Sequence, residues 1–258
     1  MQQEVLVVNE LVKTFKLSSK QQKIEKTKVK VKTAVGGISF SANKGEIFGL
    51  LGPNGAGKTT TLRILATLIK ADSGDATING VSVIANPEKV RENIGFLTSD
   101  LKLEDFFTPN YLFDFFAELH NMSKETTAQR KTELFTKFGI DEFAEVRIGE
   151  LSTGMRQKVS LVISIVHNPD FIIFDEPTNG LDVLTAKVVT DFLLELRQLG
   201  KSIILSTHIF SLVEKICDKV GIIIDGKMCC CGTLAELTKE QDLESLFFDL
   251  YKQSKEIK

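Results

Sequence analysis

The stretch that decides the fold is Gly52-Pro53-Asn54-Gly55-Ala56-Gly57-Lys58-Thr59-Thr60. It fits the pattern G-x-x-x-x-G-K-[ST], in which successive backbone N–H groups wrap a polyphosphate. The apolar residues 46–51 before the loop predict a buried strand, and residues 61–69 after it predict a helix packed on a sheet. The N-terminus of such a helix adds partial positive charge to the phosphate site. We therefore predict that this stretch forms a phosphate-binding loop.

Two side chains of the loop carry its chemistry. The Lys58 ammonium would neutralise the terminal phosphates, and the Thr59 hydroxyl would hold Mg²⁺. The alternative is a glycine-rich turn with a chance lysine. Every fixed position of the pattern is filled and both flanks are correct, which disfavours that alternative.

Two adjacent carboxylates, Asp175 and Glu176, follow the all-apolar residues 171–174. They stand at the C-terminal end of a predicted parallel strand, where ligands bind in open α/β sheets. Burying acids there without a cation is costly, so we expect Asp175 to bind Mg²⁺ directly or through water. Glu176 would polarise an attacking water. A structural ion pair is the alternative. His208 ends the next predicted strand, residues 202–207, and a phosphate-contacting role is favoured over a structural one.

Composition describes an ordinary globular chain of 258 residues with a net charge of −2, which predicts no attraction to nucleic acid. No apolar run approaches the roughly 20 residues that span a bilayer, and the N-terminus lacks a secretory pattern. We therefore expect a cytoplasmic chain that forms no membrane pore. Of its four cysteines, three are consecutive at 229–231. A metal or redox site there is possible, but small apolar residues on a late strand are favoured.

Two segments depart from the alternation of strands and helices. Residues 18–32 are rich in lysine, and from Lys26 to Lys32 lysine alternates with other residues at the period of a strand. This predicts a hairpin or mobile arm, which is either a solvated loop or a surface attracted to anionic lipid head groups. From Phe106 to Phe138 the spacing of phenylalanines becomes helical, which predicts a helical insertion. Most rings should pack inside it, and one or two would seat a partner helix.

Two further residues and one segment have local sequence signals. Phe15 is the one aromatic residue of the first predicted strand, and it would either stack on a base or cover a sheet edge. Ser152 is placed as the N-cap of a helix. A long amphipathic helix is predicted for residues 182–199, closed by Gly200.

Together these residues resemble the ATP-binding subunit of an ABC transporter across nearly the whole chain. The Walker A loop would be residues 52–60 and the Walker B segment residues 171–176. The other family motifs match, in order, Leu151-Ser152-Thr153-Gly154-Met155 (the signature), Asn179-Gly180-Leu181-Asp182 (the D-loop) and Ser206-Thr207-His208 (the switch histidine).

The resemblance implies an α/β fold, a P-loop NTPase (RecA-like) core with an antiparallel β subdomain and a helical subdomain. The single domain would span 1–258, with the core at 1–98 and 168–258 and the helical subdomain, bearing the signature, at 99–167. It implies binding of ATP and Mg²⁺ and hydrolysis of ATP. Two copies would meet head to tail, so that each ATP lies between Lys58 of one copy and Ser152 and Gly154 of the other. Asp182 and Phe15 would belong to the same site.

The chain also departs from the family pattern. Thr153 and Met155 replace the usual glycine and glutamine of the signature, and the Q-loop glutamine is absent. Ser99 stands nearest to that glutamine and is carried over as a metal contact. The lysine-rich segment, the altered signature and Phe96-Leu97-Thr98-Ser99 look like the sodium-exporting branch of the family.

The resemblance further implies an integral membrane permease as partner, no nucleic acid, and a peripheral place at the cytoplasmic face of the membrane. The coupling surface would include part of Phe106 to Leu119 and the surroundings of Ser99. Sodium efflux is the leading function. The alternatives are export of a drug, lipid or other small solute, or a soluble ABC ATPase acting on ribosomes or DNA. A P-loop nucleotide kinase would lack the signature.

Overall fold

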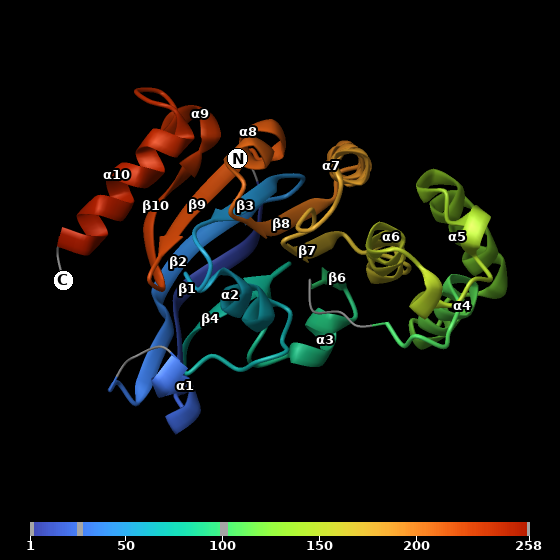
Figure 1. Ribbon diagram of the computed structural model, residues 1–258, viewed down its shortest axis with the longest axis horizontal. Helices are drawn as coiled ribbons and strands as arrows, with labels where there is room; N and C mark the ends of the chain where they lie inside the picture. The colour runs from blue at the N-terminus through green and yellow to red at the C-terminus, as the bar shows by residue number, and fades with distance from the viewer. Residues whose placement is uncertain (1–2, 25–27, 99–102, 257–258) are drawn as a thin grey trace.

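The structure, a computed structural model, describes residues 3–24, 28–98 and 103–256 (Figure 1). Two sheets organise it. The larger has the strand order β10-β9-β3-β8-β7-β6, and the smaller has the order β2-β1-β4-β5. The larger sheet is built from β3 (Ile47–Leu51), β6 (Ile94–Leu97), β7 (Phe171–Asp175), β8 (Ser202–Thr207), β9 (Lys219–Ile224) and β10 (Lys227–Thr233). The smaller contains β1 (Glu4–Lys16), β2 (Val31–Asn43), β4 (Ser73–Ile78) and β5 (Val81–Ser82).

Strand direction separates the two sheets. In the larger sheet all neighbouring strands are parallel except β10, which runs antiparallel to β9. Every pair in the smaller sheet is antiparallel. A mainly parallel sheet joined to an antiparallel one, with helices between the strands, is the α/β architecture that the sequence predicted, so the fold class is confirmed.

The described part of the chain contains ten helices, of which the last two follow the last strand and the others lie between strands. They are α1 (Ser19–Ile24), α2 (Lys58–Leu65), α3 (Pro87–Arg91), α4 (Pro109–Leu119), α5 (Lys124–Phe138), α6 (Thr153–Ser164), α7 (Val183–Gln198), α8 (Phe210–Ile216), α9 (Leu234–Leu237) and α10 (Leu243–Glu256). Two 3-10 turns, η1 (Asp141–Phe143) and η2 (Ile148–Glu150), precede α6. Every helix in residues 3–24, 28–98 and 103–256 is too short or too polar to span a bilayer.

The core consists of two apolar clusters, one on each face of the larger sheet. Because side chains alternate along a strand, β3 contributes to both. Ile47 and Leu51 belong to the cluster that includes the helical insertion, whereas Phe48 and Leu50 belong to the cluster shared with α2 and the smaller sheet. The strand that leads into the phosphate loop is therefore completely buried.

The insertion between β6 and β7 is helical, as expected. Figure 1 shows α4 and α5 at one end of the molecule, beyond α6 and away from the sheets. Fewer of its rings are buried than expected: Phe113, Phe135 and Phe138 are buried, whereas Phe106, Tyr111 and Phe115 are exposed. The exact division into a core and a helical subdomain at 99–167 stays a prediction.

The lysine-rich segment folds differently from its sequence pattern. β1 and β2 do form a hairpin, but α1 occupies part of the connection. The strand predicted from the alternation of Lys26 to Lys32 is wrong for residues 28–30, which lie outside any strand, and right only for Val31 and Lys32, which begin β2. Lys26 and Thr27 lie outside the described residues. Val29 and Val31 are exposed, so the alternation of lysine and valine does not mark a buried face of a strand.

Candidate nucleotide-binding site

Close backbone contacts fix the shape of the phosphate loop. Gly57, the residue before α2, has a φ of 108°. A Cβ atom at Gly57 would lie 2.2 Å from the backbone O of Ala34 in β2, and one at Gly52 would lie 2.2 Å from the backbone O of Ile223 in β9. Both positions therefore require glycine, since a side chain would displace backbone. The loop is held between strands of the two sheets.

Lys58 points into the loop that it belongs to. Its side chain is only 5% exposed, and its Nζ donates to the backbone O atoms of Gly52 (2.6 Å) and Pro53 (3.3 Å). The same Nζ lies 3.4 Å from Oε1 of Glu176. A buried ammonium surrounded by oxygen atoms at the mouth of the loop is positioned to bind an anion.

Thr59 and Asp175 meet where α2 begins and β7 ends. Thr59 Oγ1 donates to Asp175 Oδ1 at 3.0 Å, and the Asp175 side chain is buried. The Ser206 hydroxyl donates to the same carboxylate oxygen. Hydroxyl and carboxylate oxygens are the ligands that Mg²⁺ prefers, together with substrate phosphates. The residues present therefore fit a Mg²⁺ ion held by Thr59 and Asp175.

Glu176 adopts an unusual backbone conformation. Its φ is 53°, in the left-handed region, and its N–H donates to the backbone O of Ser206 at 3.1 Å. Such a conformation costs about 1 kcal/mol or more for a residue with a side chain, and it is concentrated at functional sites. It directs the carboxylate to Lys58 on one side and to His208 Nδ1 (3.0 Å) on the other. Because an ionised carboxylate only accepts, this contact is a hydrogen bond in the tautomer of His208 that carries a proton on Nδ1.

A pocket of about 420 Å³ is bordered by the phosphate loop and Glu176. Its lining consists of Phe15, Leu17, Lys32, Ala34, Pro53, Asn54, Gly55, Ala56, Gly57, Lys58, Thr59, Thr60, Glu176 and Asn179. Phe15 therefore lies in the same pocket as the phosphate loop, and its ring is 41% exposed. A flat, accessible ring beside a phosphate site is suited to stacking on a nucleotide base.

Ser152, Gly154 and Asp182 lie together, but they do not line that pocket. Ser152 caps α6 by accepting from the Met155 N–H at 3.2 Å, and Asp182 caps α7 by accepting from two backbone N–H groups at 3.0 Å. A Cβ atom at Gly154 would lie 3.7 Å from Asp182 Oδ2. Two capped helix N-termini thus stand side by side. Ser99 lies outside the described residues.

Sequence reasoning assigned no role to several residues that the site contains. Ser206 pairs with Asp175 in the parallel register of β7 and β8, and Lys32 pairs with Phe15 in the hairpin. The signal for Ser206 was its position two residues before His208, on the strand next to the carboxylates. Asn179 was part of the D-loop motif, whereas for Lys32 and Leu17 the sequence carried no comparable signal.

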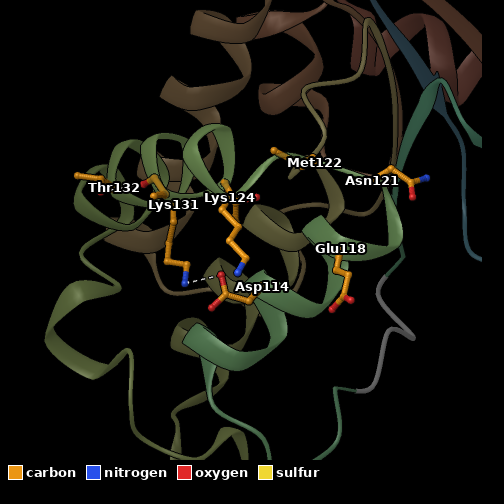
Figure 2. Close-up of a pocket in the computed structure, with 9 residues that line it drawn as sticks. Asp114, Glu118, Asn121, Met122, Lys124, Lys131 and Thr132 are labelled. Atoms are coloured by element: carbon orange, nitrogen blue, oxygen red, sulfur yellow. Dashed lines mark hydrogen bonds and ion pairs between the residues drawn. The ribbon is translucent and has the colours of Figure 1, made fainter.

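A second pocket, of about 780 Å³, lies between α4 and α5 (Figure 2). Its clearest polar contact is the ion pair of Lys131 Nζ and Asp114 Oδ1 at 2.6 Å. None of its lining residues belongs to the phosphate loop or the carboxylate pair. Although larger, this pocket lacks the groups that would bind and cleave a polyphosphate.

Comparison with known proteins agrees with the geometry of the site. The profile of the family described as ABC transporter matches residues 35–179. The ABC transporter ATP-binding protein NatA of Bacillus subtilis is 36% identical, over 85% of this chain and 89% of its own length. The linearmycin resistance ATP-binding protein LnrL of the same organism is 34% identical, over 80% of this chain and 66% of its own length.

A solved structure is similar over most of the chain. It is the dimeric structure of a post-hydrolysis state of an ATP-binding cassette bound to ADP and Pi, with a TM-score of 0.76 and 24% sequence identity. The match covers 88% of this chain and 98% of that one. This likeness concerns the fold.

Proposed function

Because the chain belongs to the ABC transporter family, we propose that it powers export through a separate permease subunit in the membrane. It is an ATPase and binds ATP with Mg²⁺. The observation that carries the proposal is the line of contacts from Lys58 through Glu176 to His208, beside the phosphate loop. These groups can grip a terminal phosphate and handle the proton of an attacking water.

Catalysis of phosphoryl transfer depends mainly on the positioning of the reacting groups. The loop amides and Lys58 bind the β- and γ-phosphates, and Phe15 stacks on the base. When bound, Mg²⁺ neutralises charge that develops on the phosphate oxygens. Glu176 accepts the hydrogen bond of the attacking water, and His208 holds the Glu176 carboxylate in place and contacts the γ-phosphate.

A second copy of the chain completes each site in our proposal. Ser152 and Gly154 lie at the N-terminus of α6, outside the pocket around Lys58. Next to Asp182, the side chains of Val183 and Leu184 are 84% and 77% exposed, and such apolar exposure favours a protein interface. The similar cassette described above is dimeric, which supports pairing of two copies.

Mixing variants tests this composite site. Ser152→Ala and Lys58→Ala proteins are each expected to be inactive. Together they should regain activity, because one site of the mixed pair combines the intact Lys58 of one copy with the intact Ser152 of the other. Ser123→Ala is the matched control, since Ser123 caps α5 in the same way and lies outside the pocket. A mixture as inactive as its components would contradict the composite site.

The permease contact is proposed for the exposed side of α4. The rings of Phe106, Phe107, Tyr111 and Phe115 form a row with centroid separations of 4.3, 4.4 and 6.2 Å. Phe106, Tyr111 and Phe115 are exposed, so the row offers an apolar seat for a helix of the partner. We also propose that Ser99, near this row in sequence, contacts the metal, and that the subunit sits at the cytoplasmic face of the membrane.

Sodium is the leading cargo in our proposal, because of the resemblance to the sodium-exporting branch. The linearmycin resistance relative supports the alternative of a drug, lipid or other small solute. Inverted vesicles that contain this subunit and its permease should take up sodium when ATP is added. Transport activity without sodium uptake would reject sodium. Co-purification with ribosomes or DNA, in place of a polytopic membrane protein, would favour the soluble alternative.

A further inference from the structure

The connection between β1 and β2 contains a concentration of lysines in the sequence. Between Phe15 and Ala34 the chain has seven lysines, no arginine and one acidic residue, although the whole protein has a net charge of −2. We call residues 16–24 and 28–32 the basic arm. Its lysines are all exposed, namely Lys16, Lys20, Lys23, Lys28, Lys30 and Lys32.

Apolar side chains are exposed among these lysines. Ile24, Val29 and Val31 are 70%, 56% and 48% exposed. A merely solvated loop gains nothing from exposed isoleucine and valine. A surface that meets lipid does gain, because aliphatic side chains enter the head-group region while the lysines stay at its charged boundary.

The presence of lysine and the absence of arginine in the basic arm favour one class of anionic partner over others. Nucleic acids and phosphorylated peptides are usually read by arginine, whose planar group makes paired hydrogen bonds. The basic arm has only lysines, which act as compact point charges toward a diffuse negative surface. It also lacks a spare aromatic platform, because Phe15 at its base lines the nucleotide pocket.

The arm is an ordered structure within its described residues. The Leu17 N–H donates to the backbone O of Lys30 at 2.9 Å, which closes the base of the arm. The Gln22 side chain donates to the backbone O of Leu17 at 3.1 Å and ties α1 to the same point. Figure 1 shows α1 at the lower edge of the molecule, away from α4 and α5. These hydrogen bonds order the backbone of the arm before it binds, which lowers the entropy lost on binding.

From these observations we propose that the basic arm binds anionic phospholipid head groups directly at the membrane surface. This contact goes beyond the proposed function, because it requires neither the permease nor ATP hydrolysis. Each lysine that reaches the surface contributes about a fivefold increase in partitioning. Four lysines together change binding by about two orders of magnitude or more.

Vesicle sedimentation of the full chain tests the proposal. The wild-type protein should bind vesicles that contain phosphatidylglycerol, bind phosphatidylcholine vesicles far more weakly, and dissociate as salt is raised. A variant with Lys20→Gln, Lys23→Gln, Lys28→Gln and Lys30→Gln should lose that binding. The control replaces four exposed lysines elsewhere by glutamine, namely Lys44, Lys89, Lys239 and Lys252. It should bind like the wild type.

Two further measurements keep the test decisive. Ile24→Ser should weaken vesicle binding about three- to tenfold without changing charge. ATP hydrolysis by the four-lysine variant should equal that of the wild type, which separates failure of the arm from failure of the ATPase. Equal vesicle binding by the four-lysine variant and the wild type would overturn the proposal. So would binding of an oligonucleotide, and not of vesicles, with the same lysine dependence.

Discussion

The Nζ of Lys58 lies 3.4 Å from Oε1 of Glu176, and both side chains are nearly buried. The cation proposed to bind the phosphate is thus already paired with the carboxylate proposed to polarise the water. Before nucleotide enters, each group compensates the charge of the other. A bound γ-phosphate would replace Glu176 as the partner of Lys58. The Glu176 carboxylate would then be available to a water molecule.

This pairing gives the first prediction. Glu176→Gln should lower the rate of ATP hydrolysis by about 10²- to 10⁴-fold, because the base is lost. Its affinity for ATP should be equal to or higher than that of the wild type, because Lys58 no longer has a competing carboxylate. Steady-state hydrolysis and calorimetric titration measure the two effects. Equal hydrolysis rates for variant and wild type would reject the role of Glu176.

Ser206 should matter for magnesium and for stability. Its buried hydroxyl donates to Asp175 and accepts from the Glu176 N–H at 3.2 Å. Ser206→Ala should lower the free energy of unfolding by about 1–2 kcal/mol and raise the Mg²⁺ concentration needed for half-maximal hydrolysis. Ser164→Ala is the control, because that buried hydroxyl donates only to Leu161 O within α6. An unchanged Mg²⁺ requirement for Ser206→Ala would contradict this.

Gly57 should tolerate no side chain. Gly57→Ala would combine a strained φ of 108° with a Cβ atom 2.2 Å from the backbone of Ala34. We expect a loss of about 2–4 kcal/mol in unfolding free energy and weaker nucleotide binding. In Gly55→Ala the φ is also positive, but no atom lies within 4 Å, so the loss should be about 1 kcal/mol. Chemical denaturation compares the two, and equal losses would contradict the contact with Ala34.

The lowered pKa of His167 predicts that the protein loses stability in mild acid. Its ring stacks on His120 at 3.8 Å, and burial, reinforced by the His120, Arg130 and Lys201 charges, lowers the pKa of His167 to about 4. The unfolded chain then binds a proton below its ordinary pKa of 6.5 that the folded chain rejects, so stability falls as pH drops from there toward 4.

The expected loss is about 1–2 kcal/mol, roughly half of the full value because the ring is partly exposed. Urea unfolding at neutral and mildly acidic pH measures it. His167→Gln should lose less stability over the same range. An identical pH dependence in that variant would show that other groups are responsible.

The cysteines should react slowly with thiol reagents. Burial raises the pKa of the Cys217 and Cys229 thiols, and it raises the pKa of Cys230 to about 11. Because the thiolate is the reactive form, labelling of these residues near neutral pH should be at least about tenfold slower than for a free thiol. Rapid labelling of Cys230 would point to a redox role. In residues 3–24, 28–98 and 103–256, no cysteine belongs to a cluster that could hold a metal.

The central strands and the loop could be predicted because their signals are local. The apolar run before Gly52 and the run from Phe171 to Phe174 each describe a strand buried on both faces. The carboxylates then follow directly in the sequence. Ser152 as an N-cap is an equally local signal, and the structure confirms it.

Other features depend on pairing across the sequence. The hydrogen bond of Ser206 with Asp175 depends on the register between two strands, which no single segment contains. Lys32 enters the pocket because β2 pairs with β1 opposite Phe15. The helix α1 is only six residues long, and so short a helix depends on its tertiary surroundings more than on propensity.

The two core clusters on opposite faces of the larger sheet have a consequence for how such subunits diversify. The phosphate loop and α2 rest on one cluster, and the helical insertion rests on the other. Substitutions that remodel the insertion can therefore accumulate without changing the apolar contacts that support α2. Subunits built in this way can therefore vary in the insertion and keep the same nucleotide-binding site.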